Sequence, residues 1–196
     1  MLSRLRRHAL VELGFTVAVA VGLAFAVQAW AVKPYKIPSG SMEPTLNPGQ
    51  RVLVDRLFFS PHVGDIVVFH PPVGADNEQC GRAHAAAAAC DWPDRAPSGE
   101  TFIKRIVAGP GDVITIRNGH VIRNGKPEPD SYIRPCAVGD PCTFGKPIRI
   151  PPGMWFMMGD NRGLSDDSRF WGPVPARWLI GNAFFTYWPP DRVGFF

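Results

Sequence analysis

The apolar positions of the chain form one long uninterrupted run and then a series of short β-branched runs. The first, residues 13–32, reads LGFTVAVAVGLAFAVQAWAV without a charge, and its length matches the ~20 residues that a transmembrane helix needs. Later runs are RVLVDRLFF (51–59), IVVFH (66–70) and VITIR (113–117), and each follows turn residues. The pattern predicts one N-terminal helix followed by short strands.

Turn residues set the limits of these strands. Asn118-Gly119 and Asn124-Gly125 are two-residue hairpin signals on either side of the short run HVIR. The chain contains 21 prolines and 20 glycines, so long helices outside residues 13–32 are not expected. The sequence therefore predicts an all-β body over residues 33–196.

Residues 74–100 break the strand pattern. The segment GADNEQCGRAHAAAAACDWPDRAPSGE is polar, rich in alanine and tipped with proline, which indicates a surface insert between two strands. Its alanine run is long enough for one or two helical turns. The residues of this insert do not indicate a function.

Charges on either side of the apolar run indicate its orientation. Three arginines at positions 4–7 precede it and Lys33 and Lys36 follow it, so the positive-inside rule weakly favours a cytoplasmic N-terminus. The alternative is a cleaved signal peptide, because Ala29-Trp30-Ala31 has the form of a cleavage site. A retained anchor is favoured, since the run exceeds the ~7 to 15 apolar residues of a signal peptide. The predicted organisation is a cytoplasmic segment (1–12), a single membrane anchor (13–32) and an extracytoplasmic domain (33–196).

The charge balance argues against one large class of partners. The formal net charge is +4 at pH 7, from 21 basic and 17 acidic residues, and no long basic run is present. Nucleic acid binding therefore has little support. The sequence also contains no glycine-rich loop of the nucleotide-binding kind.

The four cysteines lie on the predicted outer side of the membrane. An even number of cysteines in an oxidising compartment indicates local disulfides, here Cys80 with Cys90 and Cys136 with Cys142. Free thiols or a zinc site with His84 are the alternatives. Zinc is disfavoured because the spacings are not C-x-x-C.

The loop IPSGSMEPTL (37–46) places Ser39 and Ser41 two residues apart between proline and glycine residues, and either serine is a candidate nucleophile. A serine hydroxyl needs a neighbouring base that accepts its proton. None of the five histidines, at positions 8, 62, 70, 84 and 120, lies in a setting that fixes an imidazole ring. A triad assembled by tertiary proximity stays open as an alternative.

A lysine can serve as the base when burial lowers its pKa. In the run TFIKRIV (101–107), strand alternation places Lys104 on the same face as Phe102 and Ile106. The alternative is an edge lysine whose ammonium reaches solvent. The run GDNRGLSDDSRFWG (159–172) is dense in Asp, Asn, Arg and Ser, which indicates a hydrogen-bonded loop whose hydroxyls could orient a neutral amine.

Four blocks of the sequence resemble, in order, those of bacterial type I signal peptidases, also called leader peptidases, which are Ser/Lys proteases. The blocks are PSGSMEPTL (38–46), GDIVVF (64–69), FIKRIVAGPGD (102–112) and GDNRGLSDDSRFWG (159–172), and the N-terminal anchor matches as well. The resemblance implies a serine endopeptidase without a cofactor or metal. It implies a catalytic domain of two antiparallel β-sheets, of the signal-peptidase and LexA-like kind, behind one transmembrane helix.

The resemblance also implies roles for individual residues. Ser41 would be the nucleophile and Lys104 the general base, and the Ser39 hydroxyl would join the Ser41 backbone N–H in the oxyanion hole. Ser165 matches the serine that orients the lysine. Asp160, Asp167 and Arg169 match supporting residues, the last two as an ion pair, and Ile37, Met42, Leu46, Phe102 and Ile103 fall where the family lines its substrate pocket.

The implied substrates are exported preproteins, from which the family removes N-terminal signal peptides at the outer face of the cell membrane. Family members bind the substrate as an extended strand and prefer small residues at positions −1 and −3 from the cut. Nine residues separate Val32 from Ser41, so the nucleophile lies within about 30 Å of the end of the anchor. The pair Cys136 and Cys142 resembles a disulfide of some members. Two features depart from the family: Gly163-Leu164 replaces a frequent Asp-Asn pair, and the tail is short.

Other functions are separated from this one by specific features. A peptidase that matures one dedicated substrate would share the same residues. A self-cleaving LexA-like repressor needs DNA-binding helices where the apolar run stands, and a penicillin-binding enzyme needs an S-x-x-K motif that the sequence lacks. A membrane-tethered β-module with Lys104 as an edge lysine is the non-enzyme alternative. The sequence indicates neither an oligomeric state nor the range of substrates.

Overall fold

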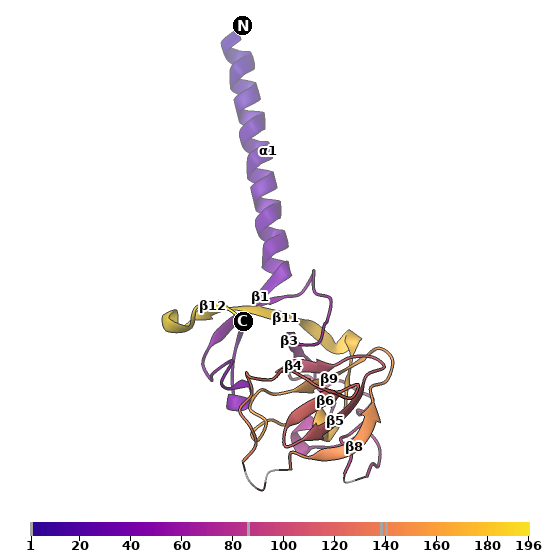
Figure 1. Cartoon of the computed structure of the whole chain (residues 1–196). Helices are drawn as coiled ribbons and strands as arrows, with labels where there is room; N and C mark the ends of the chain where they lie inside the picture. The colour runs from indigo at the N-terminus through magenta and orange to yellow at the C-terminus, as the bar shows by residue number, and fades with distance from the viewer. Residues whose placement is uncertain (1, 86, 138, 140) are drawn as a thin grey trace.

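The computed structural model describes residues 2–85, 87–137, 139 and 141–196, which form one long helix and a β-rich body (Figure 1). Helix α1 (Leu2–Ala31) projects away from the body, and the chain then enters the first strand directly. The side chains at 2–11, 24 and 26–29 lie outside the described set, and they include those of the predicted basic segment and of Ala29. Among the described residues, no helix combines the length and the apolar character that a membrane crossing needs.

The body consists of two sheets in which every described strand pair is antiparallel. The larger sheet has the order β1-β2-β11-β3-β4-β9-β10, with β12 paired to β11, and the smaller has the order β7-β6-β5-β8. The predicted all-β class with two antiparallel sheets is thereby confirmed. The strands are β1 (Val32–Lys36), β2 (Arg51–Asp55), β3 (Ile66–Phe69), β4 (Phe102–Ala108), β5 (Val113–Arg117), β6 (His120–Arg123), β7 (Lys126–Pro127), β8 (Phe144–Arg149), β9 (Met154–Met158), β10 (Val174–Pro175), β11 (Leu179–Trp188) and β12 (Gly194–Phe195).

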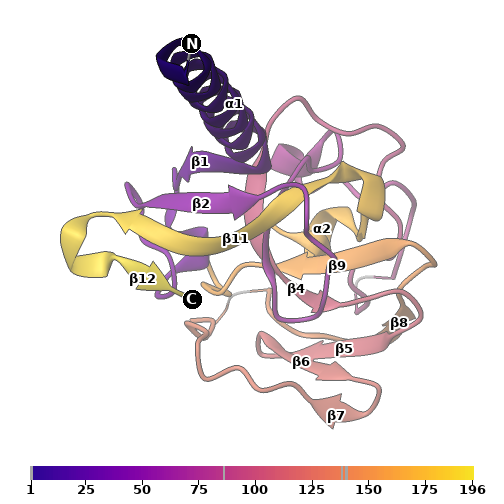
Figure 2. The same cartoon turned by 90° about the horizontal axis from the view of Figure 1, so that it is seen from above.

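Short helical turns connect the strands. Seen from above, β11 crosses the larger sheet between β2 and the β4-β9 part, and the smaller sheet lies beyond β4 and β9 (Figure 2). The turns are η1 (Gly40–Met42), η2 (Ala75–Asn77), α2 (Ser168–Trp171), η3 (Ala176–Trp178) and η4 (Pro190–Arg192).

The two predicted hairpin turns form as the sequence indicates. Asn118 and Gly119 have φ angles of 50° and 82°, and Asn124 and Gly125 have 53° and 78°. A two-residue type I′ turn needs positive φ at both positions, which asparagine and glycine tolerate best. The first turn joins β5 to β6 with Arg117 opposite His120, so the register of the smaller sheet follows from its turn.

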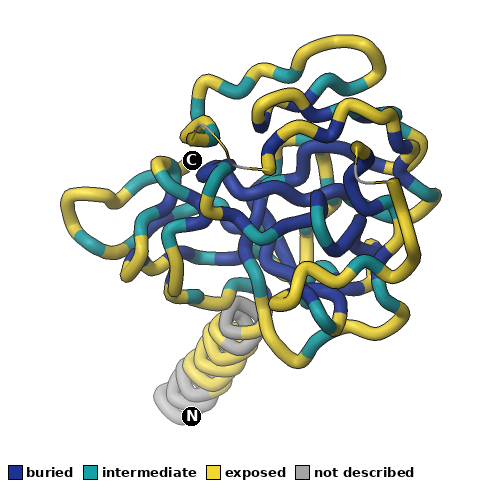
Figure 3. The backbone as a smooth tube through the Cα atoms, turned by 90° about the horizontal axis from the view of Figure 1, so that it is seen from below, coloured by how far each residue is buried: buried dark blue, intermediate teal, exposed yellow. Residues whose placement is uncertain are grey.

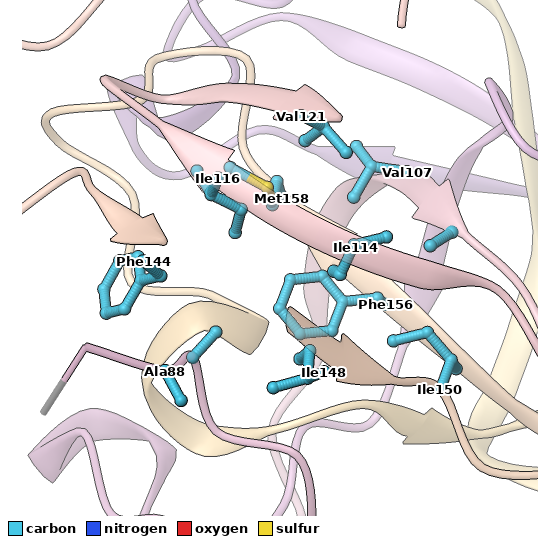
Figure 4. Packing of buried hydrophobic residues seen from close by; sticks show 12 residues of the cluster. Ala88, Val107, Ile114, Ile116, Val121, Phe144, Ile148, Ile150, Phe156 and Met158 are labelled. Carbon is cyan, nitrogen blue, oxygen red and sulfur yellow. The ribbon is translucent and has the colours of Figure 1, made fainter. Parts of the chain in front are cut away.

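A hydrophobic core joins the smaller sheet to the larger one. In Figure 4, Ile114 and Ile116 of β5 and Val121 of β6 face Val107 of β4 and Phe156 of β9, all of them buried. Buried residues fill the interior of the body, whereas the described residues of α1 before Ala31 are exposed (Figure 3). Strand β4 belongs to this interior, and it is the strand that carries the predicted base.

The segment 74–100 is only partly the surface insert that the sequence predicts. Ala88 and Ala89 are buried in the core next to Phe144 of β8, and Cys90 is fully buried. The described part of the alanine run forms no helix, because its backbone groups pair with neighbouring segments: the backbone N–H of Lys146 donates to the carbonyl of Ala87. Small apolar side chains therefore pack where a polar loop was expected.

Both predicted disulfides are present. Cys80 and Cys90 are joined with their Cα atoms 5.7 Å apart, and Cys136 and Cys142 with theirs 6.4 Å apart. The first closes the insert, and the N–H of Cys90 donates to the carbonyl of Arg169 at 2.9 Å. The insert is therefore fastened to helix α2.

Candidate active site

Apolar side chains on either side of Ser41 in the sequence pack in the core and fix the segment that carries it. Ser41 lies in the η1 turn, and Met42 and Leu46, both 0% exposed, anchor this turn in a core cluster with Ile37 and Ile103. The N–H of Leu46 donates to the carbonyl of Met42 at 2.9 Å and closes the next turn. Because its neighbour Met42 is fixed in the core, the Ser41 side chain faces the cavity described below.

The loop after β9 clamps the backbone of the Ser41 turn. The N–H of Asn161 donates to the carbonyl of Ser41 at 3.1 Å, and its side-chain amide donates to the carbonyl of Gly40 at 3.1 Å. A Cβ atom added to Gly159 would overlap the Ser41 carbonyl and the Ser165 hydroxyl. Glycine at position 159 thus allows a backbone approach that no other residue permits.

Lys104 points to Ser41 from strand β4, which packs against the η1 turn. It lies on β4 opposite Val67 of β3, and its Nζ atom is 2.8 Å from Oγ of Ser41. The side chain is only 5% exposed, and Nζ stands 5.3 Å from the centre of the Phe102 ring. The structure therefore contradicts the alternative of a solvated edge lysine.

Burial changes the acid–base properties of this lysine. Desolvation lowers the pKa of Lys104 to about 8, while the nearby carboxylates of Asp167, Asp166 and Asp160 act in the opposite direction. An unperturbed lysine, with a pKa of about 10.4, is almost wholly protonated at pH 7, whereas a pKa of about 8 leaves roughly a tenth of the molecules with a neutral amine. A neutral amine at hydrogen-bonding distance from a serine hydroxyl can accept its proton.

Ser39 lies on the open side of the Ser41 hydroxyl. The two Oγ atoms are 3.3 Å apart, and Ser39 is exposed. A hydroxyl at this distance can reach an oxyanion that forms on a carbonyl bonded to Ser41 Oγ. The structure thus brings Ser39, Ser41 and Lys104 together.

A cavity of about 420 Å³ is lined by both Ser41 and Lys104. Of the predicted pocket residues, Ile37, Phe102 and Ile103 line it, together with Ser39. Met42 and Leu46 do not, because their side chains point to the opposite side and pack in the core. The other lining residues are Tyr35, Lys36, Pro38, Val68, Asp76, Glu100, Thr101, Leu164 and Asp166.

Asp160 ties the loop after β9 to the two segments that carry the Ser41–Lys104 pair. Arg105, next to Lys104, donates from Nε and Nη2 to the two carboxylate oxygens of Asp160 at 2.9 and 2.7 Å. Thr45, four residues after Ser41, donates its hydroxyl to the same carboxylate at 2.5 Å. Asp160 is 0% exposed, and this fork-shaped pairing fixes the relative positions of the three segments.

Asp167 and Arg169 form the second buried ion pair. Arg169 donates from Nε and Nη2 to Asp167 at 2.7 and 2.9 Å, and Nη2 also donates to the carbonyls of Arg162 and Ser165. The burial of Asp167 would raise its pKa, but the Arg169 charge and hydrogen bonds, with those of Ser165 and Gly159, hold that pKa below its usual range. The predicted ion pair is therefore present and buried.

Ser165 is bonded to neighbours of the pair, and among the described residues no hydrogen bond joins it to Lys104. Its Oγ atom accepts from the N–H of Gly159 at 3.1 Å, and its hydroxyl interacts with Asp167. Among the described residues, the one hydrogen-bond partner of Lys104 Nζ is Ser41. The lysine-orienting role of Ser165 stays a prediction, and the link seen here runs through Asp167.

The described residues that line the cavity include no histidine. His70 contacts the carbonyl of Glu100, His120 contacts Asp130, and both lie outside the Ser41–Lys104 pair. The alternative of a histidine triad built by tertiary proximity is therefore contradicted by the structure.

Several site residues were not predicted from the sequence. Asn161 and Thr45 act through backbone and carboxylate contacts that only the fold creates, although both belong to the blocks that were singled out. Asp76, Glu100 and Asp166 line the cavity from the insert and from the loop after β9. The density of polar residues in 159–172 was the one signal that pointed to this loop.

The sequence matches one known protein family over most of its length. The family model described as "Signal peptidase, peptidase S26" matches residues 10–188. The chain is 37% identical over 185 residues to a protein of Synechocystis named probable signal peptidase I-1, covering 90% of this chain and 81% of that protein. It is 33% identical over 183 residues to signal peptidase I of Leptolyngbya laminosa, covering 91% and 80%. A crystal structure of a signal peptidase I from Enterococcus faecalis aligns with a TM-score of 0.45 at 23% identity, covering 63% of this chain and 97% of that one.

Proposed function

Because the chain belongs to the signal peptidase family, peptidase S26, and is thus a serine endopeptidase, we propose that it removes N-terminal signal peptides from exported preproteins with Ser41 as nucleophile and Lys104 as general base. The observation that carries this proposal is the distance of 2.8 Å between Lys104 Nζ and Ser41 Oγ at the edge of a cavity. Lys104 is only 5% exposed, and among the described residues the Ser41 hydroxyl is the one with which its Nζ atom forms a hydrogen bond.

The reaction proceeds through a covalent intermediate. Neutral Lys104 accepts the Ser41 proton while Oγ attacks the carbonyl carbon of the residue at position −1. The C–N bond of the tetrahedral intermediate then breaks, and the Lys104 ammonium gives its proton to the leaving amine, which becomes the N-terminus of the mature protein. Water hydrolyses the resulting ester of Ser41, and Lys104 takes up and returns a proton a second time.

Two donors support the developing negative charge on the carbonyl oxygen. The Ser41 backbone N–H and the Ser39 hydroxyl form the oxyanion hole, in support of which the Ser39 and Ser41 Oγ atoms are 3.3 Å apart. Removing one donor from such a site costs about 10²- to 10³-fold in kcat. Asn161 and Gly159 hold the Ser41 backbone, so the direction of its N–H is fixed before substrate binds.

The cavity beside the pair binds the residues before the cut. Its walls come from the segment 35–39 and from the start of β4, between which an extended peptide can lie. Ile37, Phe102 and Ile103 give this wall an apolar surface, which suits small apolar residues at positions −1 and −3. Position-specific preference is tested by varying the side chains at −1 and −3 of one peptide.

Helix α1 anchors the catalytic domain in the cell membrane, with residues 1–12 in the cytoplasm, 13–32 as the single span and 33–196 outside. In support, the described apolar side chains of α1 before Ala31 are exposed, for example Phe15 at 71% and Leu23 at 62%, and the helix projects away from the body, which it meets at Ala31 (Figure 1). The chain passes from α1 into β1 and reaches Ser41 within nine residues of Val32. The site thus stays near the membrane, where a signal peptide presents its cleavage site.

The proposal is tested by cleavage of a precursor. The purified full-length protein in detergent is incubated with an exported preprotein, and the products are identified by intact mass and N-terminal sequence. We expect one cut at the end of the signal peptide, and no cut by Ser41→Ala at equal concentration. A wild-type protein that leaves several precursors intact, or a Ser41→Ala variant that still cuts, contradicts the proposal.

A further inference from the structure

Two adjacent carboxylates on the loop before α2 have different surroundings. Asp167 is fully buried and paired with Arg169. Asp166 is half-buried, and within the described part of the chain it has no ion-pair partner, while its Oδ1 atom is buried without a hydrogen-bond partner. The indole N–H of Trp171 lies close enough to lower the pKa of Asp166. Its geometry is too poor for a hydrogen bond, so both the Trp171 N–H and Asp166 Oδ1 are left without a partner.

Asp166 lines the same cavity as Ser41 and Lys104. Burial raises the pKa of Asp166 to about 7, and the negative charges of Asp167 and Glu78 add to this effect, whereas the positive charge of Lys104 lowers it. In return, the Asp166 carboxylate raises the pKa of Lys104 against the larger effect of burial. The cavity thus contains an acid and a base that affect each other and change protonation in neighbouring pH ranges.

The other charges near Lys104 are already neutralised by partners. Asp160 is held by Arg105 and Asp167 by Arg169, so each acts on Lys104 as part of an ion pair. Asp166 is the carboxylate near Lys104 that lacks such compensation among the described residues. The charged groups that shift the pKa of Lys104 are Asp160, Asp166, Asp167 and Arg169. Those that shift the pKa of Asp166 are Lys104, Asp167 and Glu78. The cavity is also lined by the charged residues Lys36, Asp76 and Glu100.

We propose that Asp166 is a positioning residue for the reaction, because its carboxylate stabilises the ammonium that forms on Lys104 when Nζ accepts the Ser41 proton. This inference rests on the proposed function. The proton moves from Oγ to Nζ, the positive charge appears on Nζ, and the Asp166 carboxylate stays ionised throughout. An ionised Asp166 favours this charge, whereas a protonated Asp166 does not.

The proposal predicts a loss of activity that depends on pH. Above pH 8 wild-type Asp166 is ionised, so Asp166→Asn removes the stabilisation and lowers kcat by about threefold or more. At pH 6 wild-type Asp166 is mostly protonated, so wild type and variant have nearly equal kcat. A purely structural role would lower kcat by the same factor at every pH.

The experiment measures kcat and KM of the full-length protein in detergent on one precursor peptide from pH 6 to 9.5. Asp166→Asn and Asp166→Ala are both measured, and thermal unfolding checks that each variant is folded. The test can be read from either variant, provided that one of them folds. Asp166→Glu, which keeps the charge, should restore most of the activity at pH 9. Asp191→Asn, which removes an exposed acid on η4, should match wild type throughout.

We expect the ratio of wild-type to Asp166→Asn kcat to rise from about one at pH 6 to threefold or more at pH 9. A ratio that is constant over this range, or a variant as active as wild type at pH 9, overturns the proposal. Wild type and Ser41→Ala, assayed in parallel, report on the proposed function. Failure of that function appears in wild type, whereas failure of this inference appears only in the Asp166 variants.

Discussion

Replacing Lys104 with methionine should stabilise the protein at neutral pH while abolishing its activity. The pKa of Lys104 falls from an ordinary 10.5 to about 8 because its ammonium is buried. At about 1.4 kcal/mol for each pH unit, burial of the ammonium destabilises the folded state by about 3 kcal/mol. Methionine has a similar length and no charge, so it removes this cost, and it also loses the hydrogen bond to Ser41, worth about 1 kcal/mol.

The net gain for Lys104→Met is therefore about 2 kcal/mol at pH 7, and its dependence on pH has a definite sign. Below pH 8 Lys104 is protonated in both the folded and the unfolded chain, so wild type carries the full cost. Between pH 8 and 10.5 the folded protein has lost this proton while the unfolded chain retains it, so wild type becomes more stable as pH rises. The advantage of the variant should shrink over this range.

The assay is urea unfolding of wild type and Lys104→Met in the same detergent at pH 7 and at pH 9.5. Lys126→Met, at the start of an exposed strand, serves as the matched control and should leave stability unchanged within about 0.5 kcal/mol. A Lys104→Met variant that is less stable than wild type at pH 7 would refute the reasoning. So would an advantage that stays the same at both pH values.

Three further predictions follow from the site. Ser39→Ala should keep Ser41-dependent cleavage and lose about 10²- to 10³-fold in kcat, with little change in KM, as measured by steady-state kinetics. Gly159→Ala should displace the Ser41 carbonyl and lower activity by at least as much, and activity equal to wild type would contradict the close approach. Replacing Cys80 and Cys90 with serine should lower the free energy of unfolding by about 2 to 3 kcal/mol, and an unchanged urea midpoint would show that the disulfide does not fasten the insert.

Local chemistry explains why parts of this structure could be predicted from the sequence. The hairpin turns at Asn118 and Asn124 depend on φ angles that two residues determine. The two disulfides join cysteines that are close in sequence. The pairing of Ser41 with Lys104 was implied by family blocks, not by spacing, since 63 residues separate them.

Other features depend on tertiary packing that no local pattern encodes. Met42 was expected in the pocket, but the tight η1 turn directs its side chain to the core while its neighbour Ser41 faces the cavity. Ala88 and Ala89 were expected in a surface loop, and they are buried because β8 and α2 lie beside them. The carboxylate of Asp166 is uncompensated because Arg169 pairs with the neighbouring Asp167 instead.

The most direct test of the central claim is the pH dependence of kcat/KM for wild type and Lys104→Arg on one precursor peptide. Arginine keeps the positive charge but does not give up its proton in proteins, so it cannot accept the Ser41 proton. We predict that wild-type kcat/KM rises with pH through an apparent pKa of about 8, and that folded Lys104→Arg has no measurable turnover at any pH. Substantial turnover by Lys104→Arg, or a wild-type profile without a rise between pH 6 and 9, would contradict the Ser41–Lys104 mechanism.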